Sequence, residues 1–259
     1  DKDLLTQFHM DIASSIQSVI EEIILKIVKT LSKEMKSENL CLAGGVALNC
    51  VANGRILKEK LYKNIWVQPA AGDAGGAVGA AIAFWYKELK NKRNVSRHDG
   101  MKGSYLGPSY KNTEIEIKLN NLNANFEKFT EEEMIENIAN DLANGKTVGW
   151  FQGRMEFGPR ALGARSILAD PRNETMQKEL NLKVKYRESF RPFAPSILRE
   201  DLSNWFELDT DSPYMLLVSD IKKKIQIPMN DSDKKLFGIN KLNIKRSSIP
   251  AVTHVDYSA

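Results

Sequence analysis

The sequence has few of the residues that build covalent or metal frameworks. Its 259 residues include two cysteines, Cys41 and Cys50, and three histidines. Two cysteines in apolar surroundings argue against a disulfide framework, and their spacing is not that of a metal site. We therefore interpret both as buried thiols.

Long apolar runs are also missing. A membrane helix needs about 20 consecutive apolar residues, and no segment has them. The acidic, helix-like N-terminus does not resemble a signal peptide. The composition, with 42% hydrophobic and 27% charged residues, is that of an ordinary globular protein. We expect one large or two ordinary domains in the cytoplasm, with no membrane partner.

Positive charge is mild overall but unevenly distributed. The formal net charge is +4, while residues 146–199 contain 11 lysines and arginines against 5 aspartates and glutamates. Such a local excess favours a phosphate-bearing partner, either a nucleotide or a nucleic acid.

The first part of the chain has the pattern of an α/β layer. Residues 4–35 repeat apolar side chains every three to four positions, from Leu5 through Phe8 and Ile12 to Leu31, which predicts a long amphipathic helix. Two short strand-like segments, "NLCLAGG" and "NIWVQP", follow, each leading into a helix-like segment. The alternation predicts helices packed on a sheet.

The second part follows a polar segment without periodicity, residues 91–110, which we interpret as a linker. Thr130 and Glu133 form a capping-box pattern, with Gly145 at the expected helix end,. "TVGWF" predicts a strand, and "PFAPSIL", "PYMLLVS" and "AVTHVDY" predict further extended segments, so we expect an α+β domain with a mixed sheet. The lysine-rich residues 220–248 are interpreted as a flexible loop.

Two glycine-containing turns are candidate ligand sites. Gly44 and Gly45 lie between a strand and a helix, where backbone amides bind anions, although a plain tight turn uses the same residues. Asp73 lies between glycines at a helix start, where a carboxylate either caps the helix or ligates a metal beside a nucleotide. The residues alone leave both choices open.

The strongest signal is basic. "QGRMEFGPRALGARSI" presents arginines from turns, and "LKVKYRESFRPFAPS" adds Lys185 and Arg187, which share one face if the segment is extended,. The arginine guanidinium group binds phosphate in a bidentate manner, so we favour a triphosphate site over a solvated basic face. His254 and Asp256 are interpreted as structural hydrogen bonders, and no Ser-His-Asp arrangement or zinc cluster is present.

These segments together resemble a known family. "LAGGVALNCVANGRIL", "QPAAGDAGGAVGAA", "FQGRMEFGPRALGARSILADPR", "VKYRESFRPFAPSIL", "SPYM" and "IPAVTHVD" are similar to the O-carbamoyltransferases of the nodulation-factor, tobramycin and cephamycin type. The resemblance covers nearly the whole chain but only the later part of the family, so we expect a fragment or a truncated form.

The resemblance implies two domains and two reaction steps. Residues 1–90 would be the C-terminal part of an actin-like ATPase (Kae1-like) domain that transfers the carbamoyl group to a hydroxyl. Residues 111–259 would be most of a YrdC-like mixed α/β domain, truncated at its C-terminus, that makes carbamoyl-adenylate and pyrophosphate from ATP and carbamoyl phosphate. The acceptor would be a small molecule, such as a sugar or natural product, and the resemblance does not favour a nucleic acid partner.

The family's functional residues carry over by motif. The residues implied to hold carbamoyl phosphate and the ATP phosphates during catalysis are Arg154, Lys185, Arg187 and Arg191. The implied nucleotide-binding residues are Gly44, Gly45, Asn49, Arg160, Arg165 and Ser196. Asp73 matches a metal ligand, with Fe²⁺ as the implied metal and Mg²⁺ accompanying ATP. The family's two histidine ligands have no match in His9, His98 or His254.

Two alternatives remain open at this stage. One is a threonylcarbamoyl enzyme that modifies tRNA. The other is a module that binds a nucleotide or RNA without catalysis, for which binding that weakens steeply with salt would be the sign.

Overall fold

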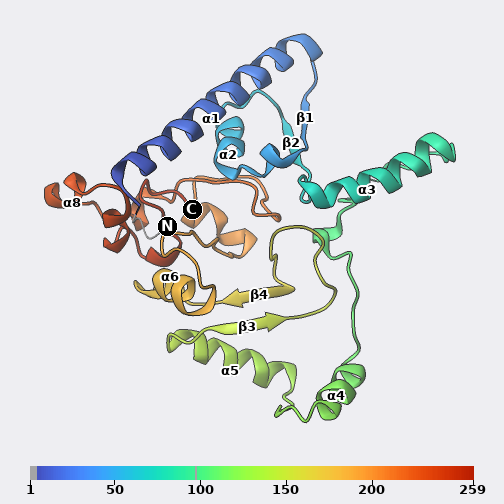
Figure 1. Ribbon diagram of the computed structural model, residues 1–259, viewed down its shortest axis with the longest axis vertical. Coiled ribbons are helices and arrows are strands. Elements are labelled where there is room, and N and C mark those ends of the chain that lie inside the picture. The colour runs from blue at the N-terminus through green and yellow to red at the C-terminus, as the bar shows by residue number, and fades with distance from the viewer. Residues whose placement is uncertain (1–4, 97) are drawn as a thin grey trace.

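The first part of the chain is a helix and strand layer, as expected. The computed structural model describes residues 5–96 and 98–259, and Figure 1 shows the element order. Strands β1 and β2 are parallel, with Leu40 opposite Ile65. The elements of this part are α1 (Gln7–Met35), β1 (Asn39–Leu42), the 3-10 helix η1 (Gly45–Leu48), α2 (Cys50–Lys58), β2 (Asn64–Val67) and α3 (Asp73–Ala83).

Helix α1 packs through a different stripe from the one that predicted it. Leu25 and Val28 are buried with Leu40 and Ile56 in one core cluster. The stripe that gave the sequence its period is exposed instead, at Leu5, Phe8, Ile12, Ile16, Ile23, Ile27 and Leu31. Periodicity therefore predicted the helix correctly but not its packed face, because α1 carries apolar residues on two sides.

The second part contains short helices and one strand pair. Strands β3 and β4 are antiparallel, with Gly149 opposite Ile167. Thr130 and Glu133 form the expected capping box, and Gly145 has a positive φ beyond the helix end. The elements are α4 (Asn112–Asn121), α5 (Glu131–Ala143), β3 (Val148–Phe151), β4 (Arg165–Leu168), α6 (Met176–Glu179), α7 (Leu202–Trp205) and α8 (Asp231–Lys235).

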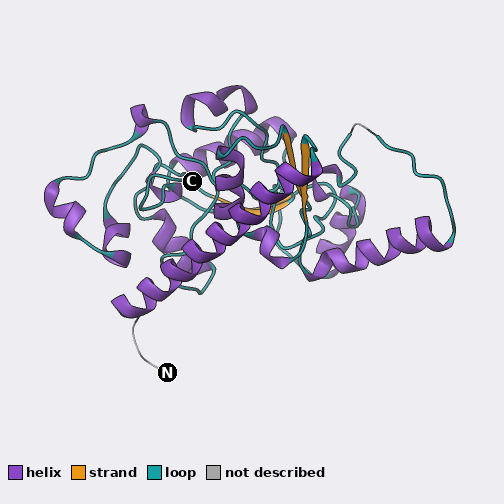
Figure 2. Cartoon of the chain, turned by 90° about the horizontal axis from the view of Figure 1, so that it is seen from above, coloured by secondary structure: helices purple, strands orange, loops and turns teal. Residues whose placement is uncertain are grey.

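The mixed sheet predicted for this part is not formed. Within the described residues, none of the three expected extended segments becomes a strand, and Asp220 and Ser258 meet only as an isolated bridge. Residues 250–252 form a 3-10 turn, and Ile249 and Val252 pack into a small cluster instead. Figure 2 shows how little of the chain is strand. The apolar runs fill small cores here instead of pairing along their backbones.

Two smaller expectations also need correction. Cys41 is exposed and Cys50 half-buried, so neither is a buried thiol. The segment 220–248 is not simply a loop, because it contains α8 and a 3-10 helix over Gly238–Asn243, and Ile221 is buried. No helix in the described residues is long and apolar enough to cross a membrane.

Residues on both sides of the expected linker share one core. Met101 is buried in a cluster with Ala47, Val67 and Tyr214, and the buried Asn53 amide donates to the carbonyl of Leu216. The parts of the chain before and after the expected linker therefore contact each other, as Figure 1 shows. The domain boundaries and the two named domain folds stay predictions.

Candidate functional site

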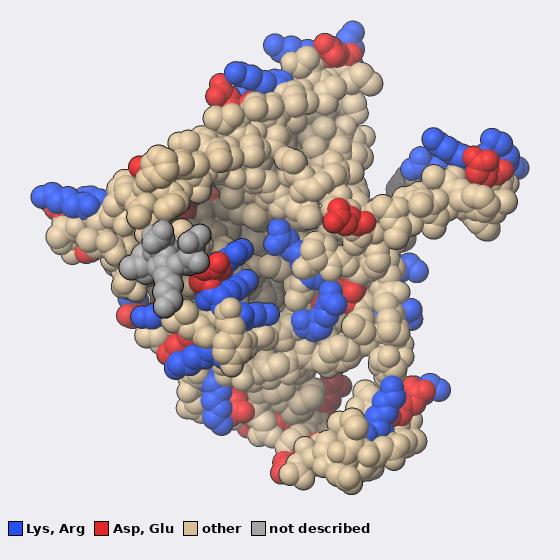
Figure 3. Space-filling view, in the orientation of Figure 1, with Lys and Arg blue, Asp and Glu red and all other residues tan. Residues whose placement is uncertain are grey.

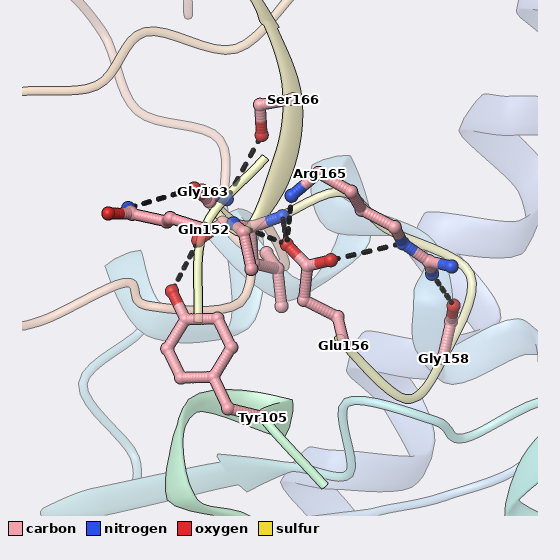
Figure 4. Close-up of polar contacts among 9 residues, drawn as sticks. Tyr105, Gln152, Glu156, Gly158, Gly163, Arg165 and Ser166 are labelled. Carbon is pink, nitrogen blue, oxygen red and sulfur yellow. Dashed lines mark hydrogen bonds and ion pairs between the residues drawn. The ribbon is translucent and has the colours of Figure 1, made fainter. Parts of the chain in front are cut away.

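A buried glutamate organises the arginine-rich segment, which we call the arginine loop (residues 153–165). The Glu156 side chain is 0% exposed, and its Oε1 accepts hydrogen bonds from the backbone amides of Leu162, Ala164 and Arg165 at 2.8, 2.8 and 3.2 Å. Burial alone would raise the pKa of this carboxyl, but the backbone amides outweigh it and the pKa is lowered,. Glu156 is therefore an anion in the middle of the loop (Figure 4).

The same glutamate pairs with one of the candidate arginines. Arg165 Nε lies 3.0 Å from Glu156 Oε2, and its Nη2 donates to the carbonyl of Gly158 at 3.1 Å. Gly158 has a φ of 124°, a conformation that strongly favours glycine. Two of the Arg165 donor nitrogens are thus held inside the loop, where they close the turn.

Neighbouring side chains hold the far end of the arginine loop. Tyr105 donates from its hydroxyl to the carbonyl of Leu162 at 2.7 Å, and the Gln152 amide donates to the carbonyl of Gly163. The backbone amide of Gly163 in turn donates to Ser166 Oγ. Figure 4 shows these bonds around the loop. The loop is an ordered platform and not a free excursion.

Arg160 connects the arginine loop to the first part of the chain. Its Nη2 donates to the carbonyl of Leu48 at 3.2 Å, at the end of η1. Its Nε is buried and has no partner among the described residues. Gly158 also approaches Ala70, whose Cβ is 3.6 Å from the position of an added Cβ. The structure thus brings together Gly44 and Gly45, which we call the glycine turn, the segment "QPAAGD" and the arginine loop.

In the glycine turn, Gly44 has a backbone conformation that favours glycine, whereas Gly45 has open space beside it. Gly44 has a φ of 96°, and its amide donates to the carbonyl of Ala71 at 3.0 Å. Nothing lies within 4 Å of a Cβ added at Gly45. Asn49 caps α2 by accepting from the Ala52 amide at 3.1 Å, and its side chain also bonds with Gln17. Asn49 therefore has a helix-capping role, while the backbone of Gly45 faces open space.

Asp73 does not form a metal centre with the other described residues. It lies in the first turn of α3 and is exposed, and the helix has no side-chain cap. No group of three histidine, cysteine, aspartate or glutamate side chains that could hold a metal occurs among the described residues. The donor set of the described residues does not fit an iron site by itself.

The second basic segment, residues 185–191, does not meet the condition under which Lys185 and Arg187 would share a strand face, because it is not extended at its start. The chain forms a π-helix over Leu180–Val184, and Lys185 is its helical C-cap, so the expected strand-like sharing of a face does not apply. Arg187 donates from Nε to Oδ1 of Asn181 at 2.6 Å and lies 5.0 Å from the Phe193 ring centre. We call residues 185–191 the 187 loop.

The remaining candidates differ in how they are held. Arg191 pairs with Glu188 at 3.0 Å. Arg154, Lys185 and Ser196 are exposed. Figure 3 shows lysine and arginine side chains around a hollow at the centre of one face, between the α1 and α2 elements above and the β3 and β4 pair below. The convergence of the two basic loops on one ligand stays a prediction.

Sequence reasoning missed two residues that contact the candidates. Glu156 is the one acidic residue of "GRMEFGPR", and its isolation among arginines and glycines was the available signal. Asn181 carried no signal, because a buried asparagine inside an apolar helical run resembles any exposed one. His254 and Asp256 were interpreted correctly: His254 Nδ1 lies 3.0 Å from Ser258 Oγ, which donates to Asp256.

Comparison with known families matches both parts of the chain. The family model for the carbamoyltransferase N-terminus matches residues 2–82, and that for the carbamoyltransferase C-terminus matches residues 139–259. The arginine loop and the 187 loop lie in the second match, and the glycine turn and Asp73 lie in the first.

Curated relatives match nearly the full length of this chain. Uncharacterized protein sll1178 of Synechocystis sp. is 58% identical over 257 residues, covering 98% of this chain and 42% of the relative. Nodulation protein NolO of Bradyrhizobium diazoefficiens is 39% identical, covering 98% of this chain and 43% of the relative. Nodulation protein U of Rhizobium fredii is 33% identical, covering 86% and 32%. The chain spans less than half the length of these relatives, and it belongs to the carbamoyltransferase family.

Proposed function

We propose that the chain forms part of an ATP-dependent O-carbamoyltransferase that makes carbamoyl-adenylate and passes its carbamoyl group to a hydroxyl. The observation that carries the proposal is the pair of ordered basic loops within the segment that matches the carbamoyltransferase C-terminus. Arginines held in place by the protein suit a reaction whose main demand is to position and neutralise phosphate groups.

The proposed adenylation consumes one water molecule. Water releases phosphate from carbamoyl phosphate and leaves carbamate. A carbamate oxygen then attacks the α-phosphorus of ATP, and the bond to the bridging oxygen of the β-phosphate breaks, which releases pyrophosphate. One phosphate and one pyrophosphate therefore leave for each carbamoyl-adenylate formed.

In the second step, the acceptor hydroxyl attacks the carbamoyl carbon and loses its proton, and AMP leaves with the bonding electrons. We assign this step to the part that contains the glycine turn, where the Gly45 backbone and Arg160 would contact the nucleotide. Mg²⁺ would accompany ATP and offset its charge. The acceptor would be a hydroxyl-bearing small molecule, as the resemblance of the sequence to O-carbamoyltransferases implies.

The roles of the basic residues follow from how each is held. Arg154 and Lys185 are exposed and would contact the phosphates directly. Arg187 is fixed by a neutral amide, so its charge remains available for an anion. Arg165 is committed to Glu156 and would shape the site without binding the nucleotide.

The test is release of pyrophosphate from ATP by the longest form of the protein, with and without carbamoyl phosphate. Release that requires carbamoyl phosphate, with an equal amount of phosphate, supports the proposal. A folded protein that binds ATP but releases neither product would contradict it and favour a non-catalytic nucleotide- or RNA-binding module.

A further inference from the structure

Asn181 is a fully buried polar residue beneath the 187 loop. It is 0% exposed and lies within the π-helix Leu180–Val184. Its Nδ2 donates to the carbonyls of Ser189 and Arg191 at 3.1 and 2.8 Å. Its Oδ1 accepts from Arg187 Nε at 2.6 Å, and its backbone carbonyl accepts from the Arg187 amide at 2.9 Å. Both Nδ2 hydrogens and the carbonyl oxygen of this side chain are thus used on one loop.

These bonds fix the loop at three separate points. The chain leaves the helix at Lys185, and Tyr186 has a φ of 48°, a left-handed conformation that costs energy for a side chain of this size. Bonds from one rigid amide to residues 187, 189 and 191 offset that cost. A buried asparagine with every group paired specifies one arrangement, because any other leaves its amide unsatisfied.

The arrangement holds Arg187 without neutralising it. Arg165, Arg172 and Arg191 each pair with a carboxylate. Arg187 instead contacts the neutral Asn181 amide and the face of Phe193, and no carboxylate lies within ion-pair distance of it among the described residues. A fixed guanidinium that forms no ion pair among the described residues is ready to bind a phosphate without first losing rotamer freedom.

We infer that Asn181 is a positioning residue that sets the Arg187 guanidinium and the 187 loop for binding the phosphate groups of the substrates. The role rests on the proposed function, since it acts on a residue assigned to that site. The neutrality of Asn181 is part of the role, because a carboxylate at this position could still accept from Arg187 Nε but would cancel its charge.

The test is a double-mutant cycle in the longest form of the protein, using Asn181→Leu and Arg187→Met. Each single variant is expected to lower kcat/KM for carbamoyl-phosphate-dependent pyrophosphate release by about 100-fold. If Asn181 acts largely through Arg187, the fold-loss of kcat/KM in the double variant is at least ten times smaller than the product of the two single fold-losses. Multiplicative effects would overturn the inference.

Asn53 gives the matched control. It is also a buried asparagine, and its amide donates to the carbonyls of Ala47 and Leu216. Asn53→Leu removes the same kind of interaction far from Arg187 along the chain, so its effect should multiply with that of Arg187→Met. Equal coupling of Asn53 and Asn181 to Arg187 would mean that Asn181 acts only through general stability, which contradicts the inference.

Asn181→Asp has nearly the same size but loses the two Nδ2 donations to the Ser189 and Arg191 carbonyls, and it tests the neutrality argument if Asn181→Leu does not fold. We expect this variant to raise the KM for carbamoyl phosphate at least tenfold. An unchanged KM would contradict the argument that Asn181 must be neutral. A second readout needs no activity: the Arg187 Nε–H resonance should exchange slowly with water in the wild type and rapidly in Asn181→Leu. Rapid exchange in both overturns the positioning role, whereas an inactive wild type with slow exchange contradicts only the proposed function.

Discussion

The carboxylate of Glu156 and the guanidinium of Arg165 lie 3.0 Å apart at the base of the arginine loop, with the glutamate side chain fully buried. The pair does two things at once. It closes the loop through the Gly158 carbonyl, and it leaves the other arginines of the loop without that carboxylate. The Glu156–Arg165 pair therefore orders the loop and also leaves its other arginines unpaired with Glu156.

Glu156→Ala is expected to destabilise the protein more than an ordinary surface change. Three backbone amides lose their acceptor, and each unsatisfied buried amide costs about 1–3 kcal/mol. We expect a loss of about 3 kcal/mol or more in the free energy of unfolding, measured by urea denaturation.

Glu22→Ala is the matched control for that experiment, because it removes an exposed glutamate paired with Lys26 in α1. Its denaturation midpoint should stay close to that of the wild type. Equal midpoints for the two variants would show that Glu156 does not organise the loop.

Gly44→Ala and Gly45→Ala separate folding from nucleotide binding. Gly44 has a φ of 96°, so alanine there is strained by about 1–3 kcal/mol. Gly45 has open space around an added Cβ, so alanine should fold normally but obstruct a nucleotide at the turn. We expect weaker ATP binding by titration calorimetry for Gly45→Ala without a lower melting temperature. Unchanged ATP affinity would return this turn to a purely structural role.

Arg154→Gln should leave stability unchanged and reduce pyrophosphate release. The side chain is exposed, so folding does not depend on it, whereas loss of one charge-stabilising group costs about 100-fold in kcat. Lys178→Gln, at an exposed position in α6, is the charge-matched control and should retain activity. A fully active Arg154→Gln variant would remove Arg154 from the site.

Stability should fall as the pH decreases below about 6.5. Burial lowers the pKa of His254 from its ordinary value of 6.5, with Arg246 adding to the effect and Asp256 opposing it. The unfolded chain therefore takes up a proton before the folded chain does, which favours unfolding at lower pH. His254→Gln should flatten the slope of the denaturation midpoint between pH 6.5 and 5, and His98→Gln, at an exposed position, should not. Parallel slopes for all three proteins would contradict this assignment.

Local signals in the sequence predicted local structure well. The capping box at Thr130 and Glu133, the helix end at Gly145 and the strand and helix alternation around α2 all depend on neighbours in the chain. The packed face of α1 and the missing mixed sheet depend on which distant segments meet, which no local pattern contains. The pairing of Arg165 with Glu156 could not be predicted for the same reason, because Glu156 is recognisable as buried only once the loop is folded.

The measurement that tests the account most directly is pyrophosphate release by the longest form of the protein, compared between wild type and Arg187→Ala. The account predicts release from ATP that requires carbamoyl phosphate in the wild type, and a folded Arg187→Ala variant that has lost it. Release without carbamoyl phosphate, or full activity in the folded variant, would contradict the assignment of these basic loops to carbamoyl-adenylate formation.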